Sequence, residues 1–231
     1  MKRMPRRLLI SMLGITSITA AFAQPAGTLY DPEPPQDSGY LRVFWAAAKG
    51  AVDIWVDGRL RASTHKAGAV SDYLIVPAGV HTIAIRDVGA KKDKTTAQLE
   101  LQRGGAVTVA FVDTPNNLAP FVFQDKANSN KLKAMLSIYN LHPKLETLSV
   151  TTADAKTKVF SDVAYGKHAS LQVNPIQAEL SIFTASDTKE SGRAKLAMSA
   201  GSNYSIFVSA QENERIHVST IESKTEKYRS K

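Results

Sequence analysis

Beyond its first 39 residues the chain consists largely of short apolar runs with a period of two, and this periodicity constrains the fold most. Leu41, Val43 and Trp45 alternate with their neighbours, and residues 52–56 repeat the pattern before Asp57-Gly58, a dipeptide typical of tight hairpin turns. No long stretch has the 3.6-residue apolar spacing of an amphipathic helix. Short alternating strands separated by Gly, Asp and Pro turns predict an all-β sandwich or barrel.

The second half of the chain repeats the pattern of the first. Four similar blocks occur in the same order at an offset of about 95 residues, which is the size of a domain. The matching blocks are 41–45 and 136–140, 54–58 and 148–154, 74–85 and 171–183, and 98–112 and 195–208. We therefore predict two similar antiparallel β-sandwich domains joined by a short linker.

The segments between these blocks give the predicted domain boundaries. Residues 98–102 and 107–112 flank Arg103-Gly104-Gly105 and predict a hairpin. Residues 223–231 are highly charged and are expected to fray. The full division is 1–23 signal peptide, 24–39 proline-rich extended arm, 40–123 first sandwich, 124–131 polar linker, 132–222 second sandwich and 223–231 charged tail.

The N-terminus has the layout of a bacterial secretory signal peptide. An apolar run from Leu8 to Phe22 ends in the small-x-small sequence Ala21-Phe22-Ala23, and it is preceded by the basic residues Lys2, Arg3, Arg6 and Arg7. A retained anchor would need roughly 20 apolar residues, and this run is shorter. We predict cleavage after Ala23 and a periplasmic location.

Charge and cysteine content exclude several classes of protein. The net charge of +8 includes the four positive charges of the signal peptide, so the mature chain has 25 basic and 21 acidic residues, a net of +4. These basic residues are scattered rather than interleaved with aromatics on one face, so nucleic acid is not an expected partner. The chain has no cysteine. Disulfides, a catalytic thiol and thiolate metal sites are therefore excluded.

Local signatures of catalysis and metal binding are absent from the sequence. Neither a Gly-x-Ser-x-Gly elbow nor a Gly-Asp-Ser block occurs, and no histidine has an Asp three residues before it. The histidines also lack metal-binding spacings such as His-x-His. They are His65, His81, His142, His168 and His217. We predict no catalytic, cofactor-binding or metal-binding residue and no cofactor, although a triad assembled from distant residues would escape this test.

Two sets of residues are candidates for binding. Trp45 and Trp55 lie on adjacent predicted strands; one is expected in the core, and the other could present an indole face to a glycan. The proline-rich arm has apolar groups on a pre-extended chain, which lowers the entropy cost of docking. Leu29, Tyr30, Pro32 and Pro34 are its candidate partner contacts. The alternative is that the arm packs onto the first sandwich.

Two segments resemble one family. Residues 29–35 (Leu-Tyr-Asp-Pro-Glu-Pro-Pro) followed by Tyr40–Phe44, together with Asn174-Pro175 before the strand 178–183, resemble AlgF, an accessory protein of alginate O-acetylation. The resemblance also covers the signal, the length and the two-domain layout. It departs across much of the second domain and the tail, which leaves open a related polymer such as cellulose.

That resemblance implies a periplasmic adaptor made of two β-sandwiches without an established catalytic triad. Its implied partners are a periplasmic acetyltransferase of the SGNH-hydrolase-like type and the polymer-export proteins, with a membrane-bound acyltransferase supplying acetyl groups. Two alternatives stay open. One is a carbohydrate-binding module that binds the polysaccharide directly through Trp45 or Trp55, and the other is an enzyme that carries acetyl on a Ser or Thr.

Overall fold

A computed structural model of the chain describes residues 33–47, 49–114, 117–184, 190–211 and 214–228. They form sixteen strands, and none of the described residues belongs to a helix long and apolar enough to span a membrane. The first eight strands are β1 (Ser38–Ala46), β2 (Ala51–Val56), β3 (Arg59–Lys66), β4 (Leu74–Pro77), β5 (Gly79–Asp87), β6 (Thr95–Leu101), β7 (Ala106–Asp113) and β8 (Leu118–Asp125). The second eight are β9 (Ala134–Asn140), β10 (Thr147–Thr152), β11 (Lys158–Ala164), β12 (His168–Val173), β13 (Gln177–Thr184), β14 (Gly192–Ala197), β15 (Asn203–Ala210) and β16 (Ile216–Glu222).

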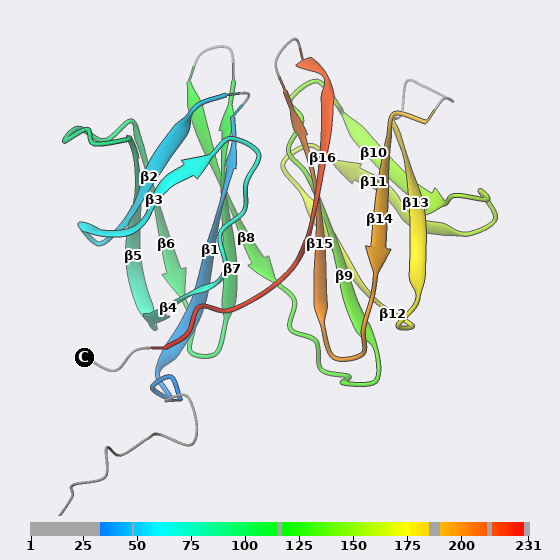
Figure 1. Cartoon of the computed structure of the whole chain (residues 1–231), viewed down its shortest axis with the longest axis horizontal. Helices are drawn as coiled ribbons and strands as arrows, with labels where there is room; N and C mark the ends of the chain where they lie inside the picture. The colour runs from blue at the N-terminus through cyan, green and yellow to red at the C-terminus, as the bar shows by residue number, and fades with distance from the viewer. Residues whose placement is uncertain (1–32, 48, 115–116, 185–189, 212–213, 229–231) are drawn as a thin grey trace, which may run out of the picture. The chain divides into compact units, whose positions relative to one another are not determined.

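These strands form two β-sandwiches with the same topology (Figure 1). In the first, the sheet β4-β1-β7-β8 packs on β3-β2-β5-β6. In the second, β12-β9-β15-β16 packs on β11-β10-β13-β14. Each strand of the first sandwich thus has a counterpart eight strands later. The predicted all-β class and the pair of similar sandwiches are confirmed.

Two features of the sheets differ from the sequence prediction. In each sandwich one central pair is parallel, β1 with β7 and β9 with β15, whereas the other pairs are antiparallel. The predicted hairpin around Arg103-Gly104-Gly105 is also wrong: β6 pairs with β5 in one sheet, and β7 pairs with β1 and β8 in the other. The turn therefore crosses between sheets. A two-residue period determines which side chains share a face, but not which strand lies alongside.

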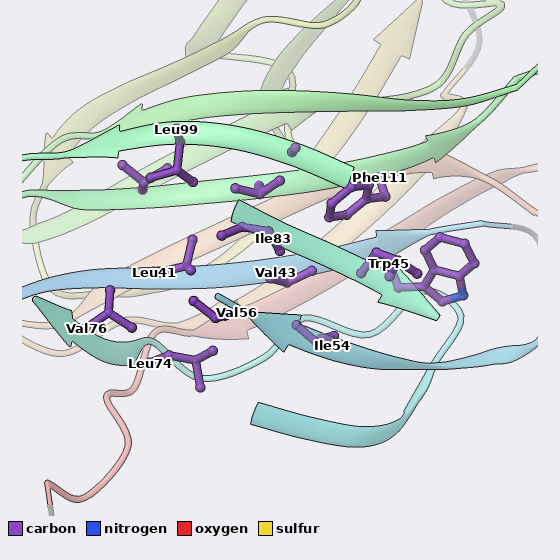
Figure 2. Packing of buried hydrophobic residues seen from close by; sticks show 14 of the residues in the cluster. Leu41, Val43, Trp45, Ile54, Val56, Leu74, Val76, Ile83, Leu99 and Phe111 are labelled. Atoms are coloured by element: carbon purple, nitrogen blue, oxygen red, sulfur yellow. The ribbon is translucent and has the colours of Figure 1, made fainter. Parts of the chain in front are cut away.

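The core of each sandwich follows the predicted alternation. Figure 2 shows Leu41, Val43 and Trp45 of β1 pointing into the first core, where they meet Ile54 and Ile83 from the facing sheet. All five are at most 2% exposed. In the second core the buried residues come from the equivalent strands. Cores filled from alternate positions of both sheets stabilise each sandwich without disulfides.

The predicted arm, linker and tail overlap or contact the described strands. β1 begins at Ser38, within the predicted arm, and β8 continues to Asp125, within the predicted linker. The signal peptide lies outside the described residues. The tail was expected to fray, which is wrong for residues 223–226, because the main chain of Lys224 and Glu226 is hydrogen-bonded to Tyr73. The sequence shows that the tail is charged, but it does not show that the tail pairs with the edge of a strand.

Candidate functional site

The sheets β4-β1-β7-β8 and β12-β9-β15-β16 use their second faces to pack against each other, and we call this contact the seam. Its apolar part is a cluster of Phe44, Ala46, Ala110, Val112, Phe123, Tyr139, Leu141 and Phe207. The ring centroids of Phe44 and Phe207 are 4.6 Å apart, and those of Tyr139 and Phe207 are 4.5 Å apart in a stacked pair. Aromatic contacts of this kind add stability beyond their buried area. β1 and β9 are consequently buried on both faces.

A single arginine dominates the polar part of the seam. Arg42 lies on β1 and is only 1% exposed. Within the first sandwich its Nε donates to Thr108 Oγ1 at 2.8 Å. Its Nη1 donates to Ser223 Oγ at 2.9 Å, and its Nη2 donates to Tyr139 Oη at 3.0 Å and Ser205 Oγ at 2.9 Å. One side chain therefore connects the first sandwich to three residues that follow or belong to the second.

Asp125, at the end of β8, provides the opposite charge. Its carboxylate accepts hydrogen bonds from Thr108 Oγ1 at 2.6 Å, from Tyr73 Oη at 2.7 Å and from Tyr139 Oη. The nearest Arg42 nitrogen lies 3.9 Å from Asp125 Oδ2. The two charges are thus coupled mainly through shared hydroxyl groups. A buried pair with every group hydrogen-bonded avoids the penalty of an isolated buried charge.

Burial and neighbouring charges in the seam shift the pKa values of its ionisable groups. Burial, and next the negative charge of Asp125, raise the pKa of Tyr73 and of Tyr139 well above the usual value. Burial alone would lower the pKa of Arg42, but Tyr139, Tyr73 and Asp125 outweigh it and raise that pKa. The guanidinium also lies over the Tyr73 ring, 4.6 Å from its centroid. The network therefore holds a permanent cation, with both phenols neutral.

A cavity of about 270 Å³ opens beside this network and is lined by residues of both sandwiches. Arg42, Tyr73 and Asp125 of the first sandwich form part of its wall, together with Asn203 and Ser205 of the second. Asn203 Oδ1 is buried and has no hydrogen-bond partner within the described part of the chain. The lining is hydroxyl-rich and lacks a second carboxylate within hydrogen-bonding distance of Asp125, so it offers positions for ordered water rather than an acid–base pair.

One serine and one histidine lie close enough to be considered as a nucleophile and its base. Ser219 Oγ and His217 Nε2 are 2.9 Å apart. However, the Gln211 side-chain amide donates to His217 Nδ1 at 2.9 Å, which places the histidine proton on Nε2. His217 then donates to Ser219, whose own hydroxyl donates to the Gly68 carbonyl at 3.0 Å. This direction of hydrogen bonding is opposite to that of an activated serine.

A histidine–carboxylate pair in the first sandwich also has both histidine nitrogens engaged by other protein groups. His81 Nδ1 lies 2.7 Å from Asp57 Oδ2, and its Nε2 lies 2.7 Å from the Pro77 carbonyl oxygen. Neither ring nitrogen is left for a substrate. Within the described ranges no group of three or more His, Asp or Glu side chains could hold a metal ion.

The sequence-predicted binding residues are not brought together. Trp45 is 2% exposed in the first core, so it presents no face to a glycan. Trp55 is half-buried on the outer face of β2, with the Arg86 guanidinium 4.1 Å from its ring centroid. Pro34 is partly exposed just before β1, and Leu29, Tyr30 and Pro32 lie outside the described residues. The arm's role as a partner contact stays a prediction.

Sequence reasoning missed the seam. Arg42 lies on the face of β1 opposite to Leu41, Val43 and Trp45, and its neighbours Phe44 and Ala46 on that face are apolar. A strand that is apolar on both faces is usually covered on both, and a charge within it needs partners. Residues 41–46 have this pattern, so the sequence did indicate that the second face of β1 is covered.

Comparison with known proteins identifies the family. The family described as "Alginate O-acetyl transferase AlgF" matches residues 10–205. The chain is 30% identical to the alginate biosynthesis protein AlgF of Pseudomonas fluorescens over 88% of each chain, and 28% identical to that of Pseudomonas aeruginosa over 72% of each. A solved structure of the C-terminal domain of AlgF from P. aeruginosa aligns at 24% identity and a TM-score of 0.35, covering 40% of this chain and 99% of that one. The chain therefore belongs to the AlgF family, which is involved in alginate O-acetylation.

Proposed function

We propose that this chain is a non-catalytic periplasmic adaptor, required for O-acetylation of alginate or a related exopolysaccharide. In this proposal it is exported by the signal peptide that ends at Ala23 and links acetylation enzymes to the polymer-export machinery. Its partners are an SGNH-type acetyltransferase and export proteins. Membership of the AlgF family supports the process, and the seam supports the adaptor role.

The single observation that carries the adaptor role is the buried Arg42 network. A scaffold has to hold its binding surfaces at a fixed separation and orientation. Arg42 makes hydrogen bonds from β1 to Tyr139, Ser205 and Ser223, so rotation of one sandwich against the other would break three charge-assisted bonds at once. Because the outer faces of β3-β2-β5-β6 and β11-β10-β13-β14 belong to different sandwiches, they are left as two separate surfaces for partners.

The non-catalytic part of the proposal is supported by the directions of hydrogen bonds. His217 donates to Ser219 instead of accepting from it, and both ring nitrogens of His81 are engaged. An enzyme that carried acetyl on a Ser or Thr would need a hydroxyl activated by a free base. Mass spectrometry after incubation with an acetyl donor tests this alternative, because an acetyl adduct would contradict the proposal.

The adaptor role is tested by a pull-down with matched genetics. A tagged chain expressed in a polymer-producing strain should capture an SGNH-type acetyltransferase, and deletion of the gene should yield polymer without acetyl groups. A variant carrying Ser219→Ala should restore acetylation as well as the unmodified chain does. Loss of acetylation with Ser219→Ala, in a protein that still folds, would favour an enzyme instead.

Direct binding of the polysaccharide is the second candidate function. Trp55 supports it, since this indole lies on an outer sheet face and keeps some exposed surface. Arg86 already covers one face of the ring, which weakens the case. Isothermal titration with alginate and cellulose oligosaccharides, acetylated and not, decides the matter: a heat of binding that Trp55→Ala removes would establish it.

A further inference from the structure

The last described segment of the chain leaves the second sandwich and ends on the first. After β16, residues Ser223 to Glu226 run to β4, as the red end of the chain shows in Figure 1. We call Ser223–Glu226 the strap. Its first residue is anchored on the second sandwich, where the Ser223 N–H donates to the Asn203 carbonyl at 2.8 Å. The Ser223 hydroxyl also accepts from Arg42.

The strap is bound as a short parallel strand. The Tyr73 N–H donates to the Lys224 carbonyl at 2.8 Å, and the Glu226 N–H donates to the Tyr73 carbonyl at 2.9 Å. Thr225 lies between these bonds and forms a parallel bridge with Tyr73. Since β4 is the edge strand of its sheet, the strap covers main-chain groups that would otherwise face outward.

A carboxylate completes the contact. Glu226 Oε1 accepts from the Ile75 N–H at 2.8 Å and pairs with the Arg61 side chain from β3. The side chain thereby takes the place of the main-chain carbonyl that a longer strand would offer to Ile75. One step further along, Pro77 has no N–H to donate. The edge of β4 therefore selects a short extended segment with one acidic side chain.

We propose that the outer edge of β4 is a docking site for an extended segment of a partner protein with one acidic side chain placed to pair with Arg61, and that the strap occupies this site until the partner displaces it. The inference rests on the proposed adaptor function and identifies one of its interaction surfaces. Charge complementarity with Arg61 determines the partner's chemistry, and the strap itself demonstrates the binding mode. Addition of a strand to a sheet edge is a common mode of peptide recognition.

The strap is suited to displacement because its contact is small. Two main-chain hydrogen bonds with Tyr73, one hydrogen bond from the Ile75 N–H to the Glu226 carboxylate and one partly exposed ion pair hold it against β4. Tethering to β16 gives it a local concentration in the millimolar range, which compensates for weak contacts. A partner that binds elsewhere on the molecule as well gains the same advantage and can replace it.

The test uses the strap as a labelled peptide. A fluorescent peptide of residues 223–231 is titrated into the purified full chain and into a chain that ends at Glu222. We expect saturable binding to the shortened chain, and binding at least about 10-fold weaker to the full chain, whose own strap competes. A peptide with Glu226→Gln should bind the shortened chain roughly 10-fold more weakly. Equal binding to both chains, or none to a folded shortened chain, would overturn the proposal.

Hydrogen exchange on the full chain covers the case in which the shortened chain does not fold. Glu226→Gln should speed exchange of the Tyr73 and Ile75 amides by about 10-fold, since opening of the strap exposes both. Glu222→Gln, an exposed carboxylate on β16, is the matched control and should leave both amides unchanged. Unchanged protection in Glu226→Gln would exclude a detachable strap. Neither experiment contains an acetylation enzyme, so a negative result here leaves the pull-down test of the adaptor role intact.

Discussion

The two sandwiches have the same strand order but differ at the faces that meet in the seam. If Leu41 is matched with Leu136, the pairing of β1 with β7 and of β9 with β15 makes Arg42 equivalent to Ser137 and Thr108 equivalent to Ser205. Continuing along β8 and β16, Asp125 is equivalent to Ser223. The first sandwich therefore provides both charges, and the second provides hydroxyl groups at the corresponding positions.

This difference makes the two faces of the seam chemically distinct and complementary. The buried Arg42 of the first face is matched by hydroxyl groups of Tyr139, Ser205 and Ser223 from the second. Two faces of the second type would have hydroxyl groups but no charge to hydrogen-bond. The two sandwiches thus have similar cores but complementary contact faces.

The largest effect is expected when the charge pair of the first sandwich is broken by replacing Arg42. Arg42→Met leaves Asp125 buried without a cation, so the free energy of unfolding should fall by about 3–5 kcal/mol. Urea denaturation measures this loss. The double variant Arg42→Met, Asp125→Leu should recover much of it, because an apolar pair needs no charge partner. A single variant as stable as the unmodified chain would refute the role assigned to Arg42.

A matched pair of core truncations tests whether the seam couples the sandwiches. Ile85 and Ile182 occupy equivalent positions, and both are 0% exposed. Each change to Ala should cost about 2–5 kcal/mol. Both tryptophans lie in the first sandwich, yet Ile182→Ala in the second should shift the unfolding transition seen by their fluorescence. If Ile182→Ala leaves the unfolding transition measured by tryptophan fluorescence unchanged, the sandwiches unfold independently.

A smaller change makes the two sandwiches more alike at one position. Tyr139 is the counterpart of Phe44, and Tyr139→Phe removes a hydroxyl that accepts from Arg42 and donates to Asp125. The free energy of unfolding should fall by about 1–3 kcal/mol. Tyr165→Phe, at a ring that packs edge-on against Phe121, is the control and should cost less. Equal losses of unfolding free energy in the two variants would show that the Tyr139 hydroxyl contributes no more to stability than the Tyr165 hydroxyl does.

High pH should weaken the seam gradually. Tyr73 and Tyr139 have a pKa raised above the ordinary value of 10.0 because they are buried beside Asp125. Above pH 10 the unfolded chain loses these protons while the folded chain keeps them, so stability is full below that pH and falls above it. The slope is about 1.4 kcal/mol per pH unit for each tyrosine. Urea denaturation across this range measures the slope, which should become shallower in Tyr139→Phe.

The smallest effect is expected at an ion pair outside the seam. Glu190 pairs with Arg193 on the second sandwich, and hydrogen bonds from Arg193 and Ser181 lower the pKa of Glu190 to about 2. Both groups face solvent, where an ion pair contributes little. Glu190→Gln should leave the urea midpoint unchanged at neutral pH. A shift comparable to that of Tyr139→Phe would mean that depth of burial does not separate the two networks.

The sequence predicted those parts of the fold that depend on neighbouring residues. Alternation identified the core faces of β1, β2 and β5, and the repeated blocks identified two similar sandwiches. β3 was missed because Arg59–Lys66 is polar along most of its length. The seam was missed because Arg42 makes hydrogen bonds to Tyr139, Ser205 and Ser223, which lie 97 to 181 positions away, and its burial depends on a sheet from the other sandwich. Local patterns carry no information about such distant partners.

The position of the strap after β16 has a consequence for the order of assembly. When the first sandwich has all its strands, Arg42 still lacks Ser223 and the edge of β4 is still uncovered. Both are supplied by the strap, so a segment that follows the second sandwich in the sequence completes contacts of the first. A chain that stops short keeps an open strand edge, which is a recognised starting point for aggregation. The strap thus protects this edge of the first sandwich only in chains that extend beyond the second.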